Sequence, residues 1–210
     1  MTVCLQYPVL EATDVSTLKR WLEGLSRDNF FYEHNNGRWG LRKVQPLSHR
    51  YINPHDSWFP VSFDYDGHVI TESITEPFAC YPENETLKKT VSIALSVMAR
   101  HGNWQSQTCQ MAMSIMQHHS LKIEETTKAI PWHRDASDDT LVILLDDQSQ
   151  WAGGDFLFQE AEAPVKRLQP KCGYGIFFSN EGTRHSVEPL TVNTEGMNRT
   201  ILSLHQKSRT

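Results

Sequence analysis

Residues 140–145 read TLVILL, and this run carries apolar side chains at both odd and even positions. Successive side chains of a β-strand point to opposite faces of its sheet. A strand that is apolar on both faces has to be covered on both, so the run predicts a central strand of the fold. Its neighbours and its cover must come from the segments before and after it.

Short strands are predicted on both sides of this central run. After Gly102 the apolar residues change from a period of about 3.6 to a period of 2, first in the run CQMAMSIMQ at residues 109–117. Regularly spaced strands with no helix between them are typical of an antiparallel sandwich or barrel. The other predicted strands lie at about 132–136, 155–160, 174–179, 185–189 and 199–205.

Two helices and a hairpin are predicted in the first half of the chain. Apolar residues at helical spacing predict an amphipathic helix over about 14–25 and a second one that begins near Glu85 and ends at Gly102. Between the two helices, Asp66-Gly67 lies inside an alternating run and predicts a β-hairpin.

The length and composition are those of one soluble globular domain. The chain has 210 residues, of which 39% are hydrophobic and 21% are charged. We expect residues 1–104 to form a helical and hairpin elaboration that packs on a β-core formed by residues 105–210. The sequence has no apolar run of membrane-spanning length, and no secretory signal is visible at its start. Four widely spaced cysteines without a Cys-x-x-Cys motif indicate reduced thiols and a cytoplasmic location.

The charge and the missing motifs disfavour several classes of function. A formal net charge of −5 disfavours a protein whose main task is to grip the phosphates of a nucleic acid. The sequence has neither a glycine-rich motif that would cradle a nucleotide phosphate nor a Gly-x-Ser-x-Gly nucleophile elbow.

The segment PWHRDASDD, residues 131–139, contains a candidate pair of metal ligands. On an extended strand, His133 and Asp135 project from the same face and would converge on one point. His185 follows 52 residues later, at the start of another predicted strand, and is a candidate third ligand. Two imidazoles and one carboxylate leave other positions of an ion open, which favours non-haem Fe(II), although zinc tolerates the same ligands.

Arg199 is a candidate anion ligand on the last predicted strand, 14 residues past His185. A buried arginine is costly unless it meets an anion, and its planar guanidinium suits bidentate contact with a carboxylate. A dicarboxylate that also chelates the metal would account for both parts of the site.

These elements together resemble a known family. The order HRD, WAGGDFLFQE, LQPKCGYGIFFSNEGTRHSVEPL and RTILSLH over about residues 105–210 is similar to the Fe(II)/2-oxoglutarate-dependent dioxygenase superfamily, and to its prolyl 4-hydroxylase-like branch. The resemblance implies a double-stranded β-helix, or jelly-roll, core with an N-terminal α/β elaboration. It implies that His133, Asp135 and His185 hold Fe(II), and that Arg199 holds the distal carboxylate of 2-oxoglutarate.

The resemblance also implies a reaction. The expected activity is hydroxylation of a C–H bond in a protein or peptide residue by O2, with release of succinate and CO2 and with ascorbate as a candidate reductant. Hydroxylation of a free amino acid or another small metabolite is the alternative within the same class. From other classes, a zinc-dependent hydrolase and a carboxylate-binding jelly roll without catalysis stay open, and so does the oligomeric state.

Two parts of the site depart from the family or remain open. Many relatives carry Ser or Thr two residues after the arginine, whereas this chain has Ile201. We expect a second contact to 2-oxoglutarate from another side chain, and expect Arg134 or Arg184, each next to a proposed ligand, to contact the substrate at the mouth of the site. The candidates for the second 2-oxoglutarate contact are Ser203, Thr200, Tyr174 and Gln117.

Overall fold

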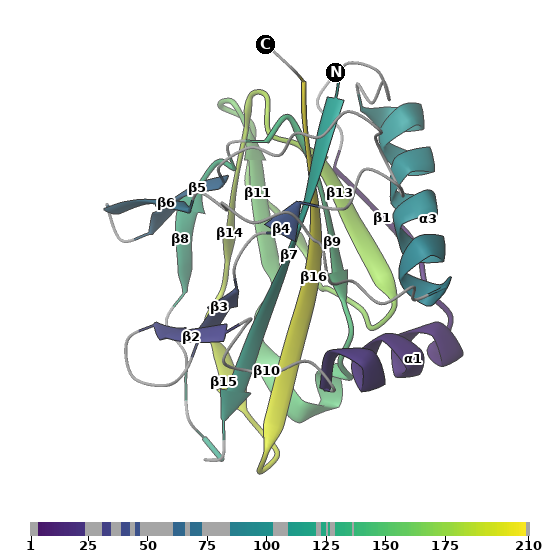
Figure 1. Ribbon diagram of the computed structural model, residues 1–210. Coiled ribbons are helices and arrows are strands. Elements are labelled where there is room, and N and C mark those ends of the chain that lie inside the picture. The colour runs from purple at the N-terminus through teal and green to yellow at the C-terminus, as the bar shows by residue number, and fades with distance from the viewer. Residues whose placement is uncertain are drawn as a thin grey trace.

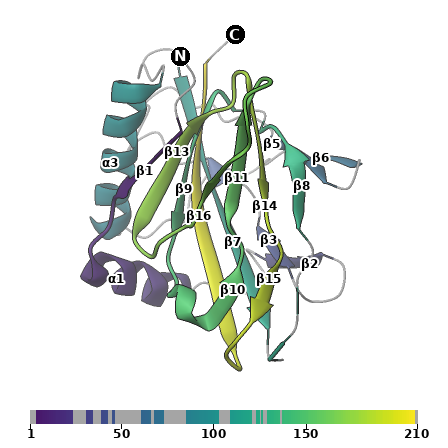
Figure 2. The same cartoon turned by 180° about the vertical axis from the view of Figure 1, so that it is seen from behind.

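Two sheets of antiparallel strands face each other in the computed structural model (Figures 1 and 2). Among the residues that the structure describes, the larger sheet has the strand order β1-β13-β9-β16-β7-β3-β2, with β4 beside β7. The smaller sheet has the order β12-β11-β14-β8. Two further antiparallel pairs are β10 with β15 and β5 with β6.

The structure describes residues 4–23, 31–34, 39–42, 45–46, 61–65, 68–72, 85–102, 109–120, 123–124, 126, 129–135 and 137–208. Its helices are α1 (Ala12–Glu23), α3 (Glu85–His101) and the short 3-10 helix η1 (Gln148–Gln150). Its strands in the first half are β1 (Cys4–Pro8), β2 (Phe31–His34), β3 (Trp39–Arg42), β4 (Gln45–Pro46), β5 (Val61–Tyr65) and β6 (His68–Glu72). Its strands in the second half are β7 (Cys109–Ser120), β8 (Ile130–His133), β9 (Asp139–Leu144), β10 (Trp151–Gly153), β11 (Phe156–Glu160), β12 (Lys166–Leu168), β13 (Tyr174–Ser179), β14 (Thr183–Val187), β15 (Leu190–Val192) and β16 (Met197–Ser208).

The run TLVILL forms most of β9, which lies between β13 and β16 in the larger sheet. Its side chains alternate between two hydrophobic clusters. Leu141 and Ile143 belong to the cluster on the helical side of the sheet, whereas Leu144 belongs to a cluster with Trp151 and Ile201 on the other side. The prediction of a central strand covered on both faces is therefore confirmed.

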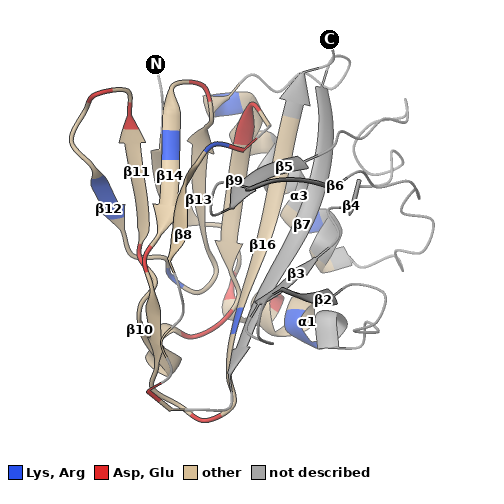
Figure 3. Ribbon diagram, turned by 90° about the vertical axis from the view of Figure 1, so that its left-hand side faces the viewer, with Lys and Arg blue, Asp and Glu red and all other residues tan. Residues whose placement is uncertain are grey.

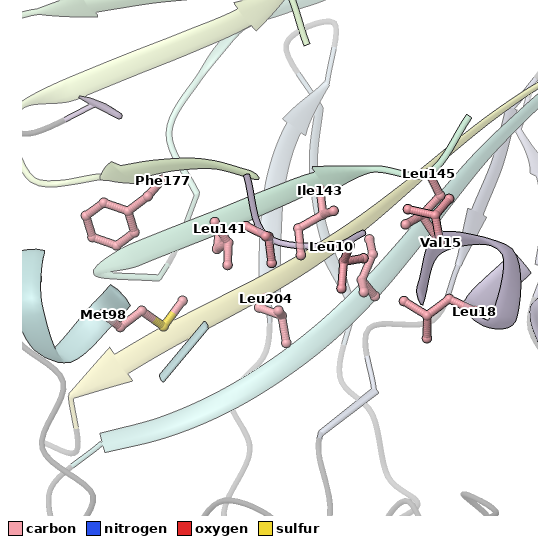
Figure 4. Packing of buried hydrophobic residues seen from close by; sticks show 11 residues of the cluster. Leu10, Val15, Leu18, Met98, Leu141, Ile143, Leu145, Phe177 and Leu204 are labelled. Atoms are coloured by element: carbon pink, nitrogen blue, oxygen red, sulfur yellow. The ribbon is translucent and has the colours of Figure 1, made fainter. Parts of the chain in front are cut away.

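The two helices cover one face of the larger sheet (Figure 1). Leu18 of α1 and Met98 of α3 are buried in one cluster with side chains of β9, β13 and β16, as Figure 4 shows. Burying a side chain of this size stabilises the fold by about 1.5–3 kcal/mol. Leu202 and Leu204 of β16 belong to this cluster, so the alternate residues of β16 face away from the helices.

The face of the larger sheet away from the helices packs against the smaller sheet. Phe156 and Phe158 of β11 form a buried cluster with Phe178 of β13 and Val187 of β14. The strands on both sides of this interior are antiparallel. The predicted class, mostly β with flanking helices and a jelly-roll core, is confirmed.

Glycines at two turns allow the close approaches that the strand connections need. Gly153, the last residue of β10, and Gly154, which follows it, have φ of +77° and +73°. A Cβ on Gly153 would lie 2.5 Å from the Pro189 carbonyl oxygen. Gly173, before β13, has φ of +77° and its carbonyl oxygen accepts hydrogen bonds from the backbone of Val9 and Leu10. L-residues with a side chain rarely adopt this conformation, so glycine is required there.

The predicted elements agree with the structure, but several strands were missed. Both helices and the hairpin of β5 and β6 are confirmed, while the turn at Asp66-Gly67 lies outside the described residues. The first strand, β1, was missed because its five residues mix polar and apolar side chains without alternation, and among the described strands it pairs with β13 alone. The other missed strands are β2, β3, β4, β10, β12 and β15.

The division of the chain at residue 104 stays a prediction. Strands from both sides of that position share the larger sheet, since β1 pairs with β13 and β3 pairs with β7. Within the described ranges, neither α1 nor α3 has the length and apolar character of a membrane-crossing helix.

Candidate active site

The predicted metal ligands come together at one end of the smaller sheet. His133 is the last residue of β8, and His185 lies directly opposite it on β14. Asp135 follows two residues after β8, so the prediction of a strand through residue 136 is wrong at its end, where the regular pairing with β14 stops. The chain still brings the carboxylate of Asp135 back to both imidazoles.

The three side chains present their donor atoms to one point. The Asp135 Oδ1 atom lies 3.7 Å from His133 Nε2 and 3.8 Å from His185 Nε2. One ligand atom from each of the three residues lies within 4.8 Å of the others. Two imidazole nitrogens and one carboxylate oxygen match the donor set of a non-haem Fe(II) site, and they are also acceptable to zinc.

The tautomer of His133 suits metal binding. Its Nδ1 atom lies 2.8 Å from the carbonyl oxygen of Pro131. A carbonyl oxygen can only accept, so Nδ1 carries the proton and donates it. This leaves Nε2, which lies 3.7 Å from Asp135 Oδ1, as the ring nitrogen that could bind a cation.

His185 is held in its neutral form by an apolar setting. Its ring centroid lies 5.4 Å from that of Phe156 and 4.6 Å from that of Phe178. Burial lowers the pKa of His185 to about 3, although Asp135 partly opposes this shift. A metal needs the unprotonated imidazole, so His185 needs no deprotonation before it binds.

Asp135 keeps its charge although it is buried. Burial by itself raises the pKa of its carboxyl group, but the neighbouring imidazoles and a hydrogen bond from Thr140 outweigh burial and hold that pKa below its ordinary value. An ionised carboxylate beside two imidazoles is an anionic set of donors. This arrangement fits a divalent metal.

The metal-free protein is expected to lose stability as the pH falls from about 7 to about 5. Burial lowers the pKa of both His185 and His205 in the folded state, whereas both titrate near 6.5 when unfolded. Below pH 6.5 the unfolded chain therefore binds protons that the folded chain does not. The free energy of unfolding should fall by at most about 1.4 kcal/mol per pH unit for each histidine.

Denaturant titrations of the metal-free protein across this pH window measure the effect. The variant His185→Gln is the control, because it removes one of the two titrating groups and should give a shallower dependence. A free energy of unfolding that stays constant or rises on acidification would contradict the neutral, buried state of these histidines.

Arg199 is buried on β16 with part of its guanidinium unused. Its side chain is 3% exposed, and its Nη1 atom has no hydrogen-bond partner in the described part of the chain. Burial lowers the pKa of Arg199 to about 10, with Asp146 partly opposing the shift, so the group stays charged near pH 7. A buried cation with an unused donor fits a bound anion.

Strand alternation places Arg199 on the inward face of β16. Arg199, Ile201, Ser203 and His205 share one face, and His205 of this face lies 3.7 Å from Asp135 Oδ2. The same face therefore carries both Arg199 and a side chain that adjoins the candidate metal ligands. Of the candidates for a second 2-oxoglutarate contact, Ser203 shares this face and Thr200 does not.

The other two candidates for the second 2-oxoglutarate contact are Tyr174 and Gln117. Tyr174 of β13 lies beneath the Lys171 ammonium group, which is 5.5 Å from the ring centroid. The side chain of Gln117, on β7, lies outside those that the structure describes. These positions leave the second contact open as a prediction.

The two arginines predicted to meet the substrate differ in their surroundings. Arg134 is exposed. Arg184 lies on β14 (Figure 3), donates from Nε to Gln159 Oε1 at 2.8 Å, and has its guanidinium 5.2 Å from the ring centroid of Trp132. Arg184 is thus already oriented by two neighbours beside the ligand-bearing strand β8.

Sequence reasoning missed four buried polar residues around Asp135: Ser137, Thr140, Asn180 and His205. Thr140 lies within the run TLVILL, whose apolar pattern predicts a buried strand and gives no sign of a role for the hydroxyl group. His205 could have been found from its place on the inward face of the strand that carries Arg199, six residues along. Asn180 follows β13 and has no signal in the sequence pattern.

Comparisons with known proteins identify the fold. No protein-family model matches the sequence, and no curated protein matches it. Solved structures match over nearly the whole chain. A prolyl-4-hydroxylase from Pseudomonas putida has a TM-score of 0.57 at 14% identity, covering 100% of this chain and 95% of the other. An oxidoreductase of the 2OG-Fe(II) oxygenase family from Burkholderia pseudomallei has a TM-score of 0.54 at 15% identity, covering 97% and 84%.

A third similar structure was solved with a peptide. It is a prolyl hydroxylase from Trichoplax adhaerens in complex with a fragment of the hypoxia inducible factor oxygen degradation domain. Its TM-score is 0.56 at 13% identity, with 98% of this chain and 83% of that chain covered. The fold is therefore that of the 2-oxoglutarate and Fe(II) oxygenases, and the resemblance that the sequence predicts is confirmed at the level of the fold.

Proposed function

We propose that the protein is an Fe(II)- and 2-oxoglutarate-dependent dioxygenase that hydroxylates a C–H bond and releases succinate and CO2. The observation that carries this proposal is the convergence of His133, Asp135 and His185 in a fold shared with such oxygenases. The buried, partly unused guanidinium of Arg199 on the inward face of β16 supports the 2-oxoglutarate part.

Each residue has a defined task in this function. The imidazoles of His133 and His185 and the carboxylate of Asp135 would hold the iron, and Arg199 would fix the distal carboxylate of 2-oxoglutarate. Bound Fe(II) would supply the activation of O2, coupled to oxidative decarboxylation of 2-oxoglutarate. The phenylalanines around His185 exclude water from its buried side.

The substrate that we propose is a residue of a protein or peptide. Two similar structures are prolyl hydroxylases, one of them in complex with a peptide, and this supports the assignment. A free amino acid or another small metabolite is the second candidate. We also propose a cytoplasmic location and ascorbate as the reductant that keeps the iron in its ferrous state.

A turnover screen tests the proposal. Purified protein is incubated under air with Fe(II), 2-oxoglutarate and ascorbate, together with a peptide library in one arm and a pool of small metabolites in the other. We expect succinate to accumulate together with a mass increase of about 16 Da, one oxygen atom, in one component. The arm that contains this component decides between the two substrate classes.

The same screen separates the other classes of function. A zinc-dependent hydrolase would be activated by Zn(II), need no 2-oxoglutarate and add water instead of oxygen. A jelly roll that only binds a carboxylate ligand would bind 2-oxoglutarate without forming succinate in either arm. Arg199 argues against the hydrolase, because hydrolysis needs no fixed dicarboxylate.

Arg134 or Arg184 is expected to contact the substrate. Replacing the responsible arginine by alanine should raise the substrate KM, or reduce the product formed per succinate, without changing iron content or 2-oxoglutarate affinity. Arg167→Ala on β12 is the matched control, because Arg167 is an exposed arginine that pairs with Glu188. If both single variants and the double variant keep wild-type kinetics with the true substrate, substrate recognition lies elsewhere.

A further inference from the structure

A buried polar cluster holds the far side of the Asp135 carboxylate. Oδ1 of Asp135 is the oxygen that faces His133 and His185, at 3.7 and 3.8 Å from their Nε2 atoms. The other oxygen, Oδ2, lies 3.0 Å from the hydroxyl of Thr140. Thr140 is completely buried on β9, so the central strand of the fold contacts one of the candidate ligands directly.

The direction of the Thr140 hydroxyl is fixed by its neighbours. A hydroxyl has one proton and two lone pairs. The amide nitrogen of Asn180 lies 3.0 Å from Thr140 Oγ1 and can only donate, so it takes one lone pair. Asp135 Oδ2 accepts a hydrogen bond from Thr140 Oγ1 at 3.0 Å, so the one proton of Thr140 is directed at Asp135.

Two further buried groups lie beside Thr140, and one of them can donate to its remaining lone pair. Ser137 Oγ lies 3.0 Å from Thr140 Oγ1, and His205 Nδ1 lies 3.3 Å from it. The Asn180 amide nitrogen also donates to Ser137 Oγ at 3.1 Å. These residues come from β9, β16 and the segments that follow β8 and β13. The Thr140 hydroxyl therefore cannot turn away from Asp135 without leaving buried polar groups unpaired.

We infer that Thr140 is a positioning residue for the metal site. Its hydroxyl holds Asp135 Oδ2 by a hydrogen bond, so that only Oδ1 is left to bind the ion. This inference rests on the proposed function. A carboxylate that uses one oxygen occupies one position on the metal and leaves the others to the two imidazoles, the cosubstrate and O2. Partners of this kind orient the ligands that they contact, and their loss typically costs 10–100-fold in metal affinity.

Titration with Co(II) alone, which replaces the oxygen-sensitive Fe(II), tests the inference without turnover. Thr140→Val keeps the shape of the side chain and removes its hydroxyl, so we expect the Co(II) dissociation constant to rise about 10–100-fold. Thr140→Ser restores the hydroxyl and should restore most of the affinity. The visible absorption of bound Co(II) should change in Thr140→Val, because Oδ2 is then no longer held away from the ion.

Thr183→Val is the matched control. Thr183 is a completely buried threonine on β14, and its Oγ1 has no hydrogen-bond partner among the described residues. Its substitution by valine should leave Co(II) affinity and absorption close to those of the wild type. Thr140→Ala is measured beside Thr140→Val, because it also lacks the hydroxyl but places no extra methyl group against the carboxylate.

The outcomes separate this inference from the proposed function. If the wild-type protein binds no Co(II), or binds it independently of Asp135, the proposed metal site itself fails. If the wild type binds Co(II) through Asp135 but a folded Thr140→Val or Thr140→Ala variant binds it equally well, only the positioning role is overturned. Equal losses in Thr140→Val and Thr183→Val would overturn it too, because they would indicate a general packing effect.

Discussion

Single replacements of His133, Asp135 or His185 by alanine are expected to abolish metal binding and turnover while the fold survives. The three donor atoms converge from β8, from the segment after it and from β14, and each supplies a separate position on the ion. We expect metal affinity to fall by more than about 100-fold, beyond the range for residues that only orient a ligand. Of the three, His185 packs against Phe156 and Phe178 of a hydrophobic cluster, so His185→Ala is expected to cost the most stability.

Metal titration, succinate production and thermal unfolding of each variant measure these effects. His101→Ala is the matched control, because His101 lies exposed near the end of α3, on the helical side of the larger sheet. It should keep both metal affinity and turnover. Near-full succinate production by any of the three ligand variants would remove that residue from the proposed metal site.

Arg199→Ala is expected to weaken 2-oxoglutarate binding at least tenfold. Removing one partner of a desolvated, hydrogen-bonded ion pair costs about 2–5 kcal/mol. Arg199 is buried, and its Nη1 donor has no hydrogen-bond partner among the described residues, so this donor is available to the distal carboxylate.

The measurement is a titration of 2-oxoglutarate into metal-loaded protein, with Arg199→Lys and Arg184→Ala beside Arg199→Ala. Arg199→Lys keeps the charge but loses the planar pair of donors, so its affinity should lie between those of the wild type and of Arg199→Ala. Arg184→Ala should bind 2-oxoglutarate normally. An unchanged affinity in Arg199→Ala would move the anion site, with Arg184 or Lys171 as the next candidates.

The sequence predicts the larger elements of the fold because their patterns are set by burial. The run at residues 140–145 needs cover on both faces, and the structure supplies helices on one side, and the β10–β15 pair together with the smaller sheet on the other. Short strands such as β1 could not be predicted in the same way. β1, β10 and β15 pair with strands that are distant in sequence, so pairing and not local pattern decides where they form.

The candidate ligands could be predicted because their chemistry is visible in single residues and their spacing. The network around Asp135 could not, because it is made by tertiary contacts between β9, β16 and the segments after β8 and β13. Thr140 lies in an apolar run and Asn180 follows a strand, and nothing in either local sequence indicates that the two side chains are joined by a hydrogen bond. The end of β8 at His133 was also missed, since the strand pattern continues past the last residue paired with β14.

The effect of a metal ion on 2-oxoglutarate affinity tests the central claim most directly, because the account has one small molecule contacting both the ion and Arg199. We expect Fe(II), added without oxygen, to raise the affinity for 2-oxoglutarate at least tenfold, about 1.4 kcal/mol of coupling. Glutarate, which lacks the 2-oxo group, should show no such gain. Equal affinity for 2-oxoglutarate with and without Fe(II) would contradict the account, because the anion at Arg199 would then not reach the metal.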